Sequence, residues 1–394
     1  MKILFTNHRL RDRGGSELFT AEAAAELVRR DHQVAVFSSV GGPIAEAVAK
    51  AGITVIPSPA ACPFTPDLIH GQHHLETMAA LCAWPGIPAI YFLHGYGPWE
   101  EHPPAHPRIL RYAAPCPVFL PWLAQTRGVA GPQVKLIRNF FDPAGFPHRR
   151  APERRPARCL IYHNTMDPAG PVFKAIATAC AGKGFALETA GASFGTVWEK
   201  PGEHLPAYDV VFASGRSALE AMACGCAVVP VTREQTGAWI SPENFATVLD
   251  RNFTLHPDGP THEAPLPEVL TSIRFDQLPA LADRVRTTLT LSSTVDALEA
   301  AYQEILDLPL PSDPAAGSVA LSDYLTFLAA YVKQSDADRA RLLDKCDEST
   351  RRAARWKEQA EAARQRLEQI QSTLETGSWW HRRLWRRLRR ESEV

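Results

Sequence analysis

The sequence predicts an α/β protein with two Rossmann-like, doubly wound domains that face each other across a cleft. Short apolar runs alternate with Ala- and Leu-rich runs over the first 145 residues, and the same alternation restarts near residue 159. Alternating strands and helices are typical of parallel sheets that are covered by helices on both faces. A chain of 394 residues is long enough for two such domains and an additional segment.

The first domain is expected to span residues 1–145. The pattern predicts helices at Ser16–Arg30, Pro43–Ala51 and Leu75–Trp84. Strands are predicted at Lys2–Asn7, Gln33–Ser39, Thr54–Pro57, Leu68–Gln72, Ala89–His94, Pro117–Leu120 and Val134–Asn139. Three prolines and five arginines then interrupt the pattern over residues 144–158, which is typical of an exposed connector.

The second domain is expected to span residues 146–307. Its predicted strands are Cys159–Asn164, Ala186–Ala190, Asp209–Ala213 and Ala227–Val231. Its predicted helices are Gly170–Gly182, Ser217–Cys224 and a long helical stretch over about 277–307. Open parallel sheets bind ligands at the carboxyl ends of their strands, so two such domains in tandem predict a ligand cleft between them.

The composition narrows the class of protein. With 45% hydrophobic and 22% charged residues, the chain is globular rather than disordered. A net charge of −1 argues against a uniformly basic protein, and we expect no nucleic acid as a partner. Arginines at positions 9, 11 and 13 interrupt any signal sequence, and no apolar run approaches the ~18 residues of a membrane-spanning helix. The cysteines are scattered without a CxxC pair, so we expect cytoplasmic thiols and no metal site.

Beyond the two domains, the sequence predicts a helical segment over residues 318–376, after a Pro-rich linker at 309–317. Spacings of three and four residues give this segment an apolar seam over 342–374. The seam residues are Leu342, Cys346, Ser349, Ala353, Trp356, Ala360, Ala363, Leu367, Ile370 and Leu374. The seam predicts a coiled-coil homodimer, with a single helix packed on its own protein as the alternative.

Residues 377–394 form a basic tail. This tail carries six basic and two acidic side chains, whereas residues 1–319 carry 26 basic and 31 acidic ones. A short basic helix with tryptophans suits an anionic membrane surface. An RNA-binding tail and a solubilising terminus are the alternatives. The membrane interpretation predicts a peripheral protein at the inner face of the cytoplasmic membrane.

Two loops have residues suited to anions. The first runs from Arg13 through Gly14 and Gly15 to Ser16, ahead of the first helix, where free N–H groups and the helix dipole favour negative charge. The same residues also suit an ordinary turn with an N-cap. The second loop contains Gly215, Arg216, Ser217 and Glu220, and its arginine suits a phosphate. Ser217 and Glu220 also have the spacing of a capping box, so the pattern alone leaves both interpretations open.

A family resemblance favours the ligand-binding interpretation. The segment EAMACGCAVV at 220–229 resembles the EAMAxGxPVV signature of the group-one, family-four glycosyltransferases, which have the GT-B fold. The Gly14–Gly15 loop, the segment YFLHG at 91–95, the entry to the hinge at 134–142 and the helical stretch at 277–307 resemble this family in the same order. The similarity covers about residues 1–307. It implies an acceptor-side first domain and a second domain that binds a nucleotide-sugar donor.

The resemblance also implies roles for individual residues. Glu220 would hold the ribose of the donor, and His94 would lie beside the transferred sugar. The implied catalytic residues are His94, Arg216 and Glu220. The residues implied in donor binding are Gly14, Gly15, His163, Asn164, Gly215, Arg216, Ser217 and Glu220. Members of the family generally retain the anomeric configuration and need no metal or other cofactor.

Two departures from the family pattern favour a rival function. The acidic residue that usually stands eight positions before the EAMA glutamate is replaced by Phe212. The usual Arg…Lys pair is missing near His163 and Asn164, where the only cation is Lys174, further along the chain. Arg216 is a candidate replacement for the missing charge. The main prediction is transfer of a sugar to a glycan or lipid-linked acceptor in envelope polysaccharide synthesis. The rival is a catalytically degenerate, membrane-associated scaffold.

Overall fold

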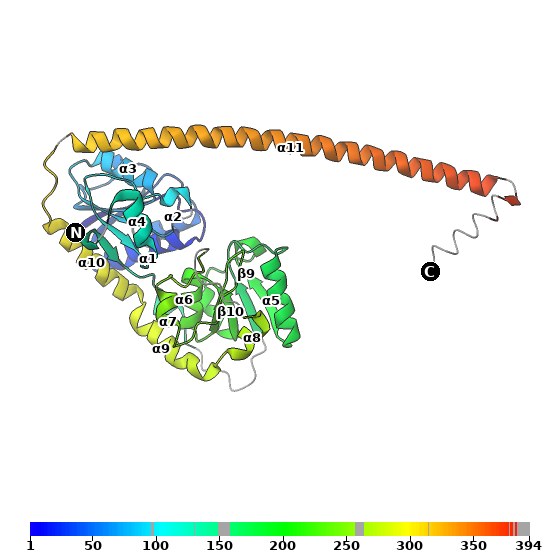
Figure 1. Cartoon of the computed structure of the whole chain (residues 1–394). Helices are drawn as coiled ribbons and strands as arrows, with labels where there is room; N and C mark the ends of the chain where they lie inside the picture. Colours follow the sequence, from blue (N-terminus) through cyan, green and yellow to red (C-terminus); the bar gives the residue numbers. More distant parts are fainter. Residues whose placement is uncertain are drawn as a thin grey trace. The chain divides into compact units, whose positions relative to one another are not determined.

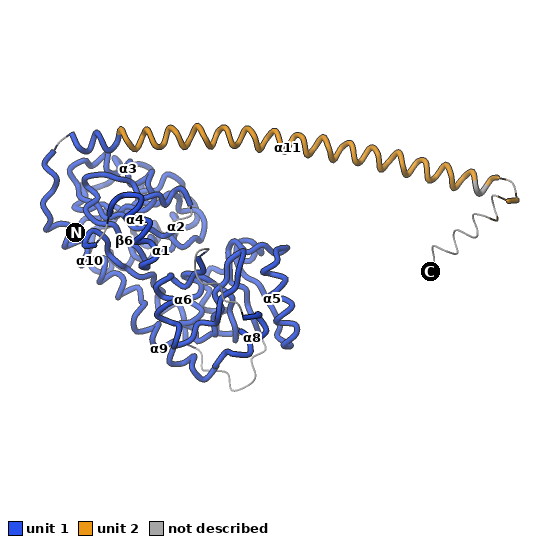
Figure 2. Tube along the Cα trace, in the orientation of Figure 1, with its two compact units in different colours: residues 1–321 blue, residues 322–394 orange. Residues whose placement is uncertain are grey.

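The computed structural model describes residues 1–95, 98–129, 131–148, 158–256, 264–313, 315–377, 379–380 and 383. The chain forms two compact units, residues 1–321 and residues 322–394 (Figures 1 and 2). The first unit contains two parallel sheets and the helices that cover them. The α/β class and the two-sheet organisation predicted from the sequence are confirmed.

The sheet of the first domain has seven parallel strands in the order β3-β2-β1-β4-β5-β6-β7. These strands are β1 (Lys2–Asn7), β2 (Gln33–Ser38), β3 (Thr54–Ile56), β4 (Leu68–Gln72), β5 (Ala89–Phe92), β6 (Ile109–Ala114) and β7 (Val134–Leu136). The strand order reverses between β1 and β4, which is where open sheets bind ligands. The loops that leave the carboxyl ends of β1, β4 and β5 carry His8, His73 and His94.

One strand prediction for this sheet is wrong. The predicted strand Pro117–Leu120 overlaps the start of helix α4 (Phe119–Arg127), and the strand that precedes it is β6. The apolar pattern of β6 is broken by Arg111, which obscures the strand in the sequence. The guanidinium of Arg111 lies 2.8 Å from the carboxylate of Glu304, in helix α10 (Leu291–Asp307). A carboxylate from a distant helix therefore accommodates the charge.

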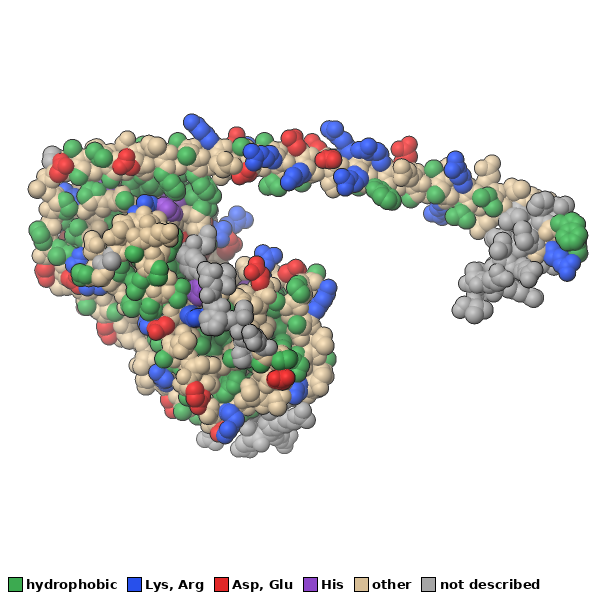
Figure 3. All heavy atoms as spheres, in the orientation of Figure 1, with side chains coloured by type: hydrophobic (Ala, Val, Ile, Leu, Met, Phe, Trp, Pro, Cys, Tyr) green, Lys and Arg blue, Asp and Glu red, His purple; other side chains and the backbone are tan. Residues whose placement is uncertain are grey.

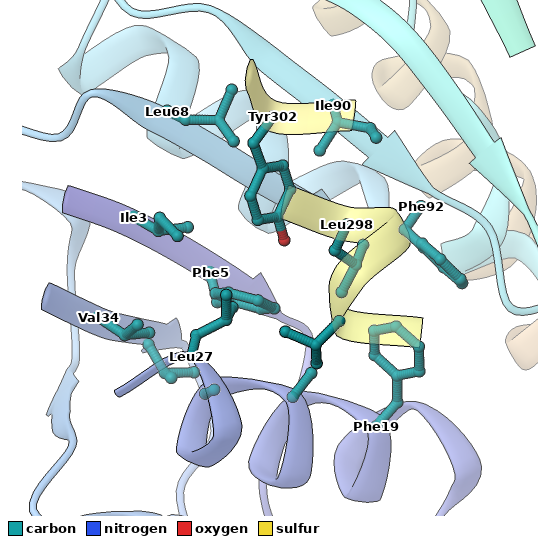
Figure 4. Close-up of a cluster of buried hydrophobic side chains, with 14 of the residues drawn as sticks. Ile3, Phe5, Phe19, Leu27, Val34, Leu68, Ile90, Phe92, Leu298 and Tyr302 are labelled. Carbon is teal, nitrogen blue, oxygen red and sulfur yellow. The ribbon is translucent and has the colours of Figure 1, made fainter. Parts of the chain in front are cut away.

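The other helices of the first domain are α1 (Gly15–Arg29), α2 (Pro43–Lys50) and α3 (His74–Ala83). Although α10 follows the second domain in the chain, its buried face belongs to the core of the first. Figure 4 shows Leu298 and Tyr302 of α10 among side chains of β1, β5 and α1. The hydroxyl of Tyr302 lies 2.6 Å from Nδ1 of the buried His70. The range 146–307 therefore includes one helix that packs with residues 1–145.

The second domain has a four-stranded parallel sheet in the order β11-β10-β8-β9. Its strands are β8 (Arg158–Tyr162), β9 (Ala186–Ala190), β10 (Val210–Ala213) and β11 (Ala227–Pro230). Its helices are α5 (Pro171–Gly182), α6 (Gly215–Ala223), α7 (Phe245–Leu249), α8 (Leu266–Ser272) and α9 (Leu278–Thr288). The strand order reverses between β8 and β10, so the loops that begin at His163 and Ser214 leave neighbouring strands at the same edge.

The chain crosses between the two domains twice, and the crossings are bonded to each other. The amide of Phe141 donates to the carbonyl of Leu289 at 3.2 Å, and the amide of Leu291 donates to the carbonyl of Phe141 at 3.0 Å. The side chain of Phe141 is buried in the core of the second domain. These bonds tie the start of α10 to the connector between the sheets.

Helix α11 (Ala316–Thr376) makes up most of the second unit. The side chains of residues 332–373 are largely exposed, and those of Leu342, Trp356 and Leu367 are each about 60–70% exposed. Figure 3 shows acidic, basic and hydrophobic side chains interspersed along this helix. No described helix is long and apolar enough to cross a membrane. Most of the tail predicted to contact a membrane lies outside the described residues.

Candidate functional site

A cavity of about 600 Å³ is lined by residues of both domains of the first unit. Arg13, Leu18 and Glu22 line it from the start of α1 and the loop before it. The residues that line it from the second domain include Tyr162, Asn164, Trp198, Arg216 and Glu220. The cavity is therefore located where the tandem-domain pattern predicts a ligand cleft, and three of the predicted site residues line it.

The start of α6 presents Arg216 and Glu220 to this cavity. Gly215 is the first residue of the helix and has a φ of +56°, a left-handed conformation that favours glycine. Its amide donates to the carbonyl of Phe253 at 3.1 Å, so that amide is not available to a ligand. The next amides, of Arg216 and Ser217, lie in the first turn, where N–H groups have no acceptor within the helix.

Arg216 and Glu220 belong to a partly buried charge network. Nε of Arg216 donates to Oε1 of Glu220 at 2.8 Å, and Nη2 of Arg216 donates to both carboxylate oxygens of Glu22 at 2.6 and 2.7 Å. Oε2 of Glu220 accepts from the hydroxyl of Tyr162 at 3.3 Å. The capping-box interpretation is wrong, because the N-cap of α6 is Ser214 and the carboxylate of Glu220 bonds to side chains.

The pKa values in this network follow from burial and pairing. Burial raises the pKa of Glu220 above its usual range, and the Arg216 guanidinium opposes that rise. Burial also lowers the pKa of Arg216, but the carboxylates of Glu22 and Glu220 outweigh it and raise that pKa above its usual value. Arg216 therefore stays charged, and its charge is shared by two carboxylates.

His163 and Asn164 follow β8 and hold the neighbouring loops in place. Nδ1 of His163 accepts from the amide of Thr165 at 3.2 Å, and Oδ1 of Asn164 accepts from the amide of Ala192 at 3.1 Å. Burial, and secondarily the charge of Arg233, lowers the pKa of His163. Of this pair, Asn164 lines the cavity and His163 does not. Lys174 on α5 does not line it either.

The glycine loop before α1 contributes one residue, Arg13, to the first-domain side of the cavity. A Cβ atom on Gly14 would lie 2.3 Å from the carboxylate of Glu17, so a larger residue here would require that side chain to shift. A Cβ atom on Gly15 would meet nothing within 4 Å, which indicates open space beside it. Arg13 lines the cavity and has no hydrogen-bond or ion-pair partner among the described residues. It is therefore a cation available to an anionic ligand.

His94 belongs to a cluster of polar side chains within the first domain. Its Nε2 lies 2.6 Å from Oε1 of Gln72, and its amide donates to Oε2 of Glu101 at 3.0 Å. Oε1 of Glu101 lies 3.5 Å from Nε2 of His73. Burial lowers the pKa of His94 to about 4, so its imidazole is neutral near pH 7. His94 does not line the cavity.

Residues 99–102 follow the His94 loop and include a buried carboxylate. Glu101 is buried, and its pKa stays below the usual range because hydrogen bonds and charge from His73 outweigh its burial. The ring of Trp99 contacts that of His74, with centroids 4.7 Å apart. In the part of the chain that the structure describes, no group of three or more His, Cys, Asp or Glu side chains is arranged to hold a metal ion.

Comparison with known proteins identifies the fold. No protein-family model matches the sequence, and no curated protein shows significant similarity to it. A glycosyltransferase from Rickettsia africae ESF-5 superposes with a TM-score of 0.61 and 14% identity, covering 78% of this chain and 99% of that one. Anabaena Alr3699/HepE in complex with UDP-glucose superposes with a TM-score of 0.55 and 16% identity, covering 77% of this chain and 100% of that one. The chain has the GT-B fold.

Within the GT-B fold, the predicted site residues fall into two groups. Arg216, Glu220 and Asn164 line the cavity between the domains. Gly14, Gly15, His94, His163, Gly215 and Ser217 lie at the carboxyl ends of the two sheets without lining that cavity. Phe212, where the family pattern has an acidic residue, is fully buried in the core beside α5. The side chain at this position packs among apolar residues, so the acidic group of the family pattern has no counterpart here.

Three residues of the GT-B cleft are not evident from the sequence. The sequence indicates Arg13 only as the first residue of its glycine loop, without a role of its own. Glu22 lies on a helix face where acidic side chains are common, so no signal separates it from a solvated residue. Tyr162 ends a buried strand and resembles a core residue, and its contact with Glu220 depends on the pairing of β8 with β10. These positions are found only when the two sheets are assembled.

Proposed function

We propose that this chain is a glycosyltransferase that moves a sugar from a nucleoside-diphosphate donor to a hydroxyl group of a glycan or lipid-linked acceptor. The observation that carries the proposal is the position of Glu220 and Arg216, which line the cleft of a GT-B fold from the start of α6. Catalysis would retain the anomeric configuration and need no metal. The enzyme would work in envelope polysaccharide synthesis at the inner face of the cytoplasmic membrane, with residues 377–394 on anionic lipid.

The charges of the cleft suit a departing nucleoside diphosphate. Negative charge develops on this group as the bond to the sugar breaks, and fixed donors in a water-poor site stabilise it. Arg13, Arg216 and the free amides at the start of α6 supply positive potential from both walls. The carboxylate of Glu220 is an acceptor for two neighbouring ribose hydroxyls. The complexes that the Anabaena protein forms with UDP-glucose, and with UDP and glucose, support a nucleotide-sugar donor.

His94 would contribute as a neutral group. A neutral imidazole whose Nε2 is engaged by Gln72 has a defined orientation, and it can exchange hydrogen bonds with sugar hydroxyls without attracting the diphosphate. Glu101 would act as a positioning residue, because it holds the amide of His94 and the ring of His73 at once. On this proposal, the polar cluster of the first domain serves the acceptor side of the reaction.

Calorimetric titration with UDP and with GDP tests the donor site. We expect one of the two to bind, and Glu220→Ala to weaken its binding by at least tenfold, which corresponds to about 1.4 kcal/mol. The matched control is Glu268→Ala, which removes an exposed carboxylate from α8 of the same domain and should leave affinity unchanged. If neither nucleotide binds the wild-type protein, the enzyme proposal fails. The scaffold function, which the buried Phe212 favours, would then be preferred.

A further inference from the structure

Arg216 has little capacity left for a ligand in the free protein. A guanidinium carries five N–H donors, on Nε, Nη1 and Nη2. Nε is bonded to Glu220 and Nη2 is bonded to both oxygens of Glu22, so only Nη1 has no hydrogen bond to the described residues. The side chain of Arg216 is 12% exposed and that of Glu22 is 29% exposed. The N–H groups on Nε and Nη2 are therefore engaged by two carboxylates.

The contact with Glu22 joins the two domains across the cleft. Glu22 lies in the second turn of α1, after the glycine loop of the first domain, whereas Arg216 lies in the first turn of α6 in the second domain. Glu22 and Glu220 both bond to the guanidinium of Arg216, so two carboxylates share its positive charge. A diphosphate brought to the same guanidinium would be repelled by the carboxylate of Glu22 and would compete for the same N–H groups.

From these contacts we infer that Glu22 is an internal competitor of the donor's diphosphate. In the free protein its carboxylate occupies the Nη2 donors of Arg216, and the bound diphosphate takes its place. Glu22 thereby lowers the affinity of the cleft for anionic ligands. This inference rests on the proposed function, since it assumes that a nucleoside diphosphate binds beside Arg216.

If Glu22 instead positions Arg216 for the ligand, the predicted change in ligand affinity has the opposite sign. If Glu22 only held Arg216 in the orientation that a ligand needs, removing its charge would weaken ligand binding. If Glu22 competes with the ligand, removing its charge strengthens binding, because the ligand no longer displaces charge-assisted hydrogen bonds between Glu22 and Nη2 of Arg216. The sign of the change therefore separates the two roles.

The experiment compares the full-length wild-type protein with Glu22→Gln, which keeps the size of the side chain. UDP and GDP are titrated calorimetrically at low ionic strength, and the nucleotide that binds the wild type is used throughout. We expect Glu22→Gln to bind it about tenfold more tightly. Glu46→Gln, which neutralises an exposed carboxylate on α2, should bind as the wild type does. The nucleoside without phosphates, uridine or guanosine, should bind both proteins equally.

A second variant assigns the gain to Arg216. Adding Arg216→Gln to Glu22→Gln removes the guanidinium for which the two anions compete, so the gain from Glu22→Gln should disappear in that background. Thermal unfolding of each variant checks that it is folded. Unchanged or weaker nucleotide binding by Glu22→Gln overturns the inference and leaves the donor site standing. Absence of binding by both the wild type and Glu22→Gln overturns the proposed function itself.

Discussion

Glu220 and Arg216 illustrate how a charged pair becomes stable where each charge alone would be costly. Both side chains are largely buried, and a buried charge without a partner is strongly destabilising. Each therefore depends on the other, with the Tyr162 hydroxyl completing the carboxylate's hydrogen bonds. Removing Arg216 leaves an unpaired carboxylate, whereas removing Glu220 leaves a guanidinium that still has Glu22. Glu220→Ala is thus the better variant for binding measurements.

Histidines with lowered pKa values predict how stability depends on pH. Burial lowers the pKa of His94 to about 4, below the value of 6.5 that an unfolded chain would have. The stabilisation is present above pH 6.5 and is lost as pH falls towards 4, because the unfolded chain binds the proton first. His94→Gln should flatten this dependence by up to about 1.4 kcal/mol per pH unit between pH 6 and pH 5.

Urea unfolding at pH 7, 6 and 5 measures this effect. His148→Asn, which replaces an exposed histidine, is the matched control. An equal slope in wild type and His94→Gln would contradict a lowered pKa of the imidazole at this position. His74, whose pKa burial also lowers to about 4, continues to contribute in the variant, so the dependence should weaken without vanishing.

Local sequence reveals some residues of the cleft and conceals others. The start of α6 is predictable because a strand, a glycine and an amphipathic helix follow one another within fifteen residues. The partnership of Arg216 with Glu22 joins residues 194 positions apart and depends on the packing of two domains. The sequence presents Ser217 and Glu220 as a capping box equally well. Only the side-chain contacts of Glu220 separate these interpretations.

At the scale of elements, most helices and strands follow from periodicity, and the exceptions have physical causes. Strand β6 is hard to recognise because Arg111 lies inside it, paired with Glu304 of α10. Helix α10 is predictable as a helix. The domain against which it packs is not predictable, because an amphipathic face does not specify which core it covers. Leu298 and Tyr302 place that face in the first domain. Tertiary packing decides both cases.

For α11, we propose pairing with a second copy of the chain through the seam at 342–374. Opposite charges at three- and four-residue spacing, such as Arg364 and Glu368, stabilise the helix itself, and apolar seam side chains such as Leu367 are exposed along it. A parallel coiled coil would bury Leu367 and Ile370 against their copies. Light scattering after size exclusion should therefore give twice the mass of one chain.

A pair of charge-matched variants tests that seam. Leu367→Glu with Ile370→Glu places two carboxylates on the seam and should produce a monomer. Gln365→Glu with Gln369→Glu adds the same charge away from the seam and should remain a dimer. A wild-type protein with the mass of one chain would contradict the proposed pairing.

At the scale of the whole molecule, the proposed chemistry depends on two domains that share one cleft. The two crossings between them are hydrogen-bonded at Phe141, Leu289 and Leu291, close to the start of α10. Arg13 and Glu22 enter the cleft from the first domain, and Arg216 and Glu220 enter it from the second. The two-domain organisation can be predicted from the sequence. These side chains face one another only when both domains are folded and packed together.

Release of a nucleoside diphosphate from sugar nucleotides tests the central proposal most directly. The full-length protein is incubated with a panel of UDP- and GDP-linked sugars, and free UDP or GDP is measured over time, with and without added glycan or lipid-linked acceptors. We predict release from at least one donor, acceleration by an acceptor, and loss of at least about 90% of the rate in Glu220→Ala, as expected for a contact worth about 1.4 kcal/mol or more. Release at the same rate by wild type and Glu220→Ala, or from no donor at all, would contradict a glycosyltransferase with its donor site at α6.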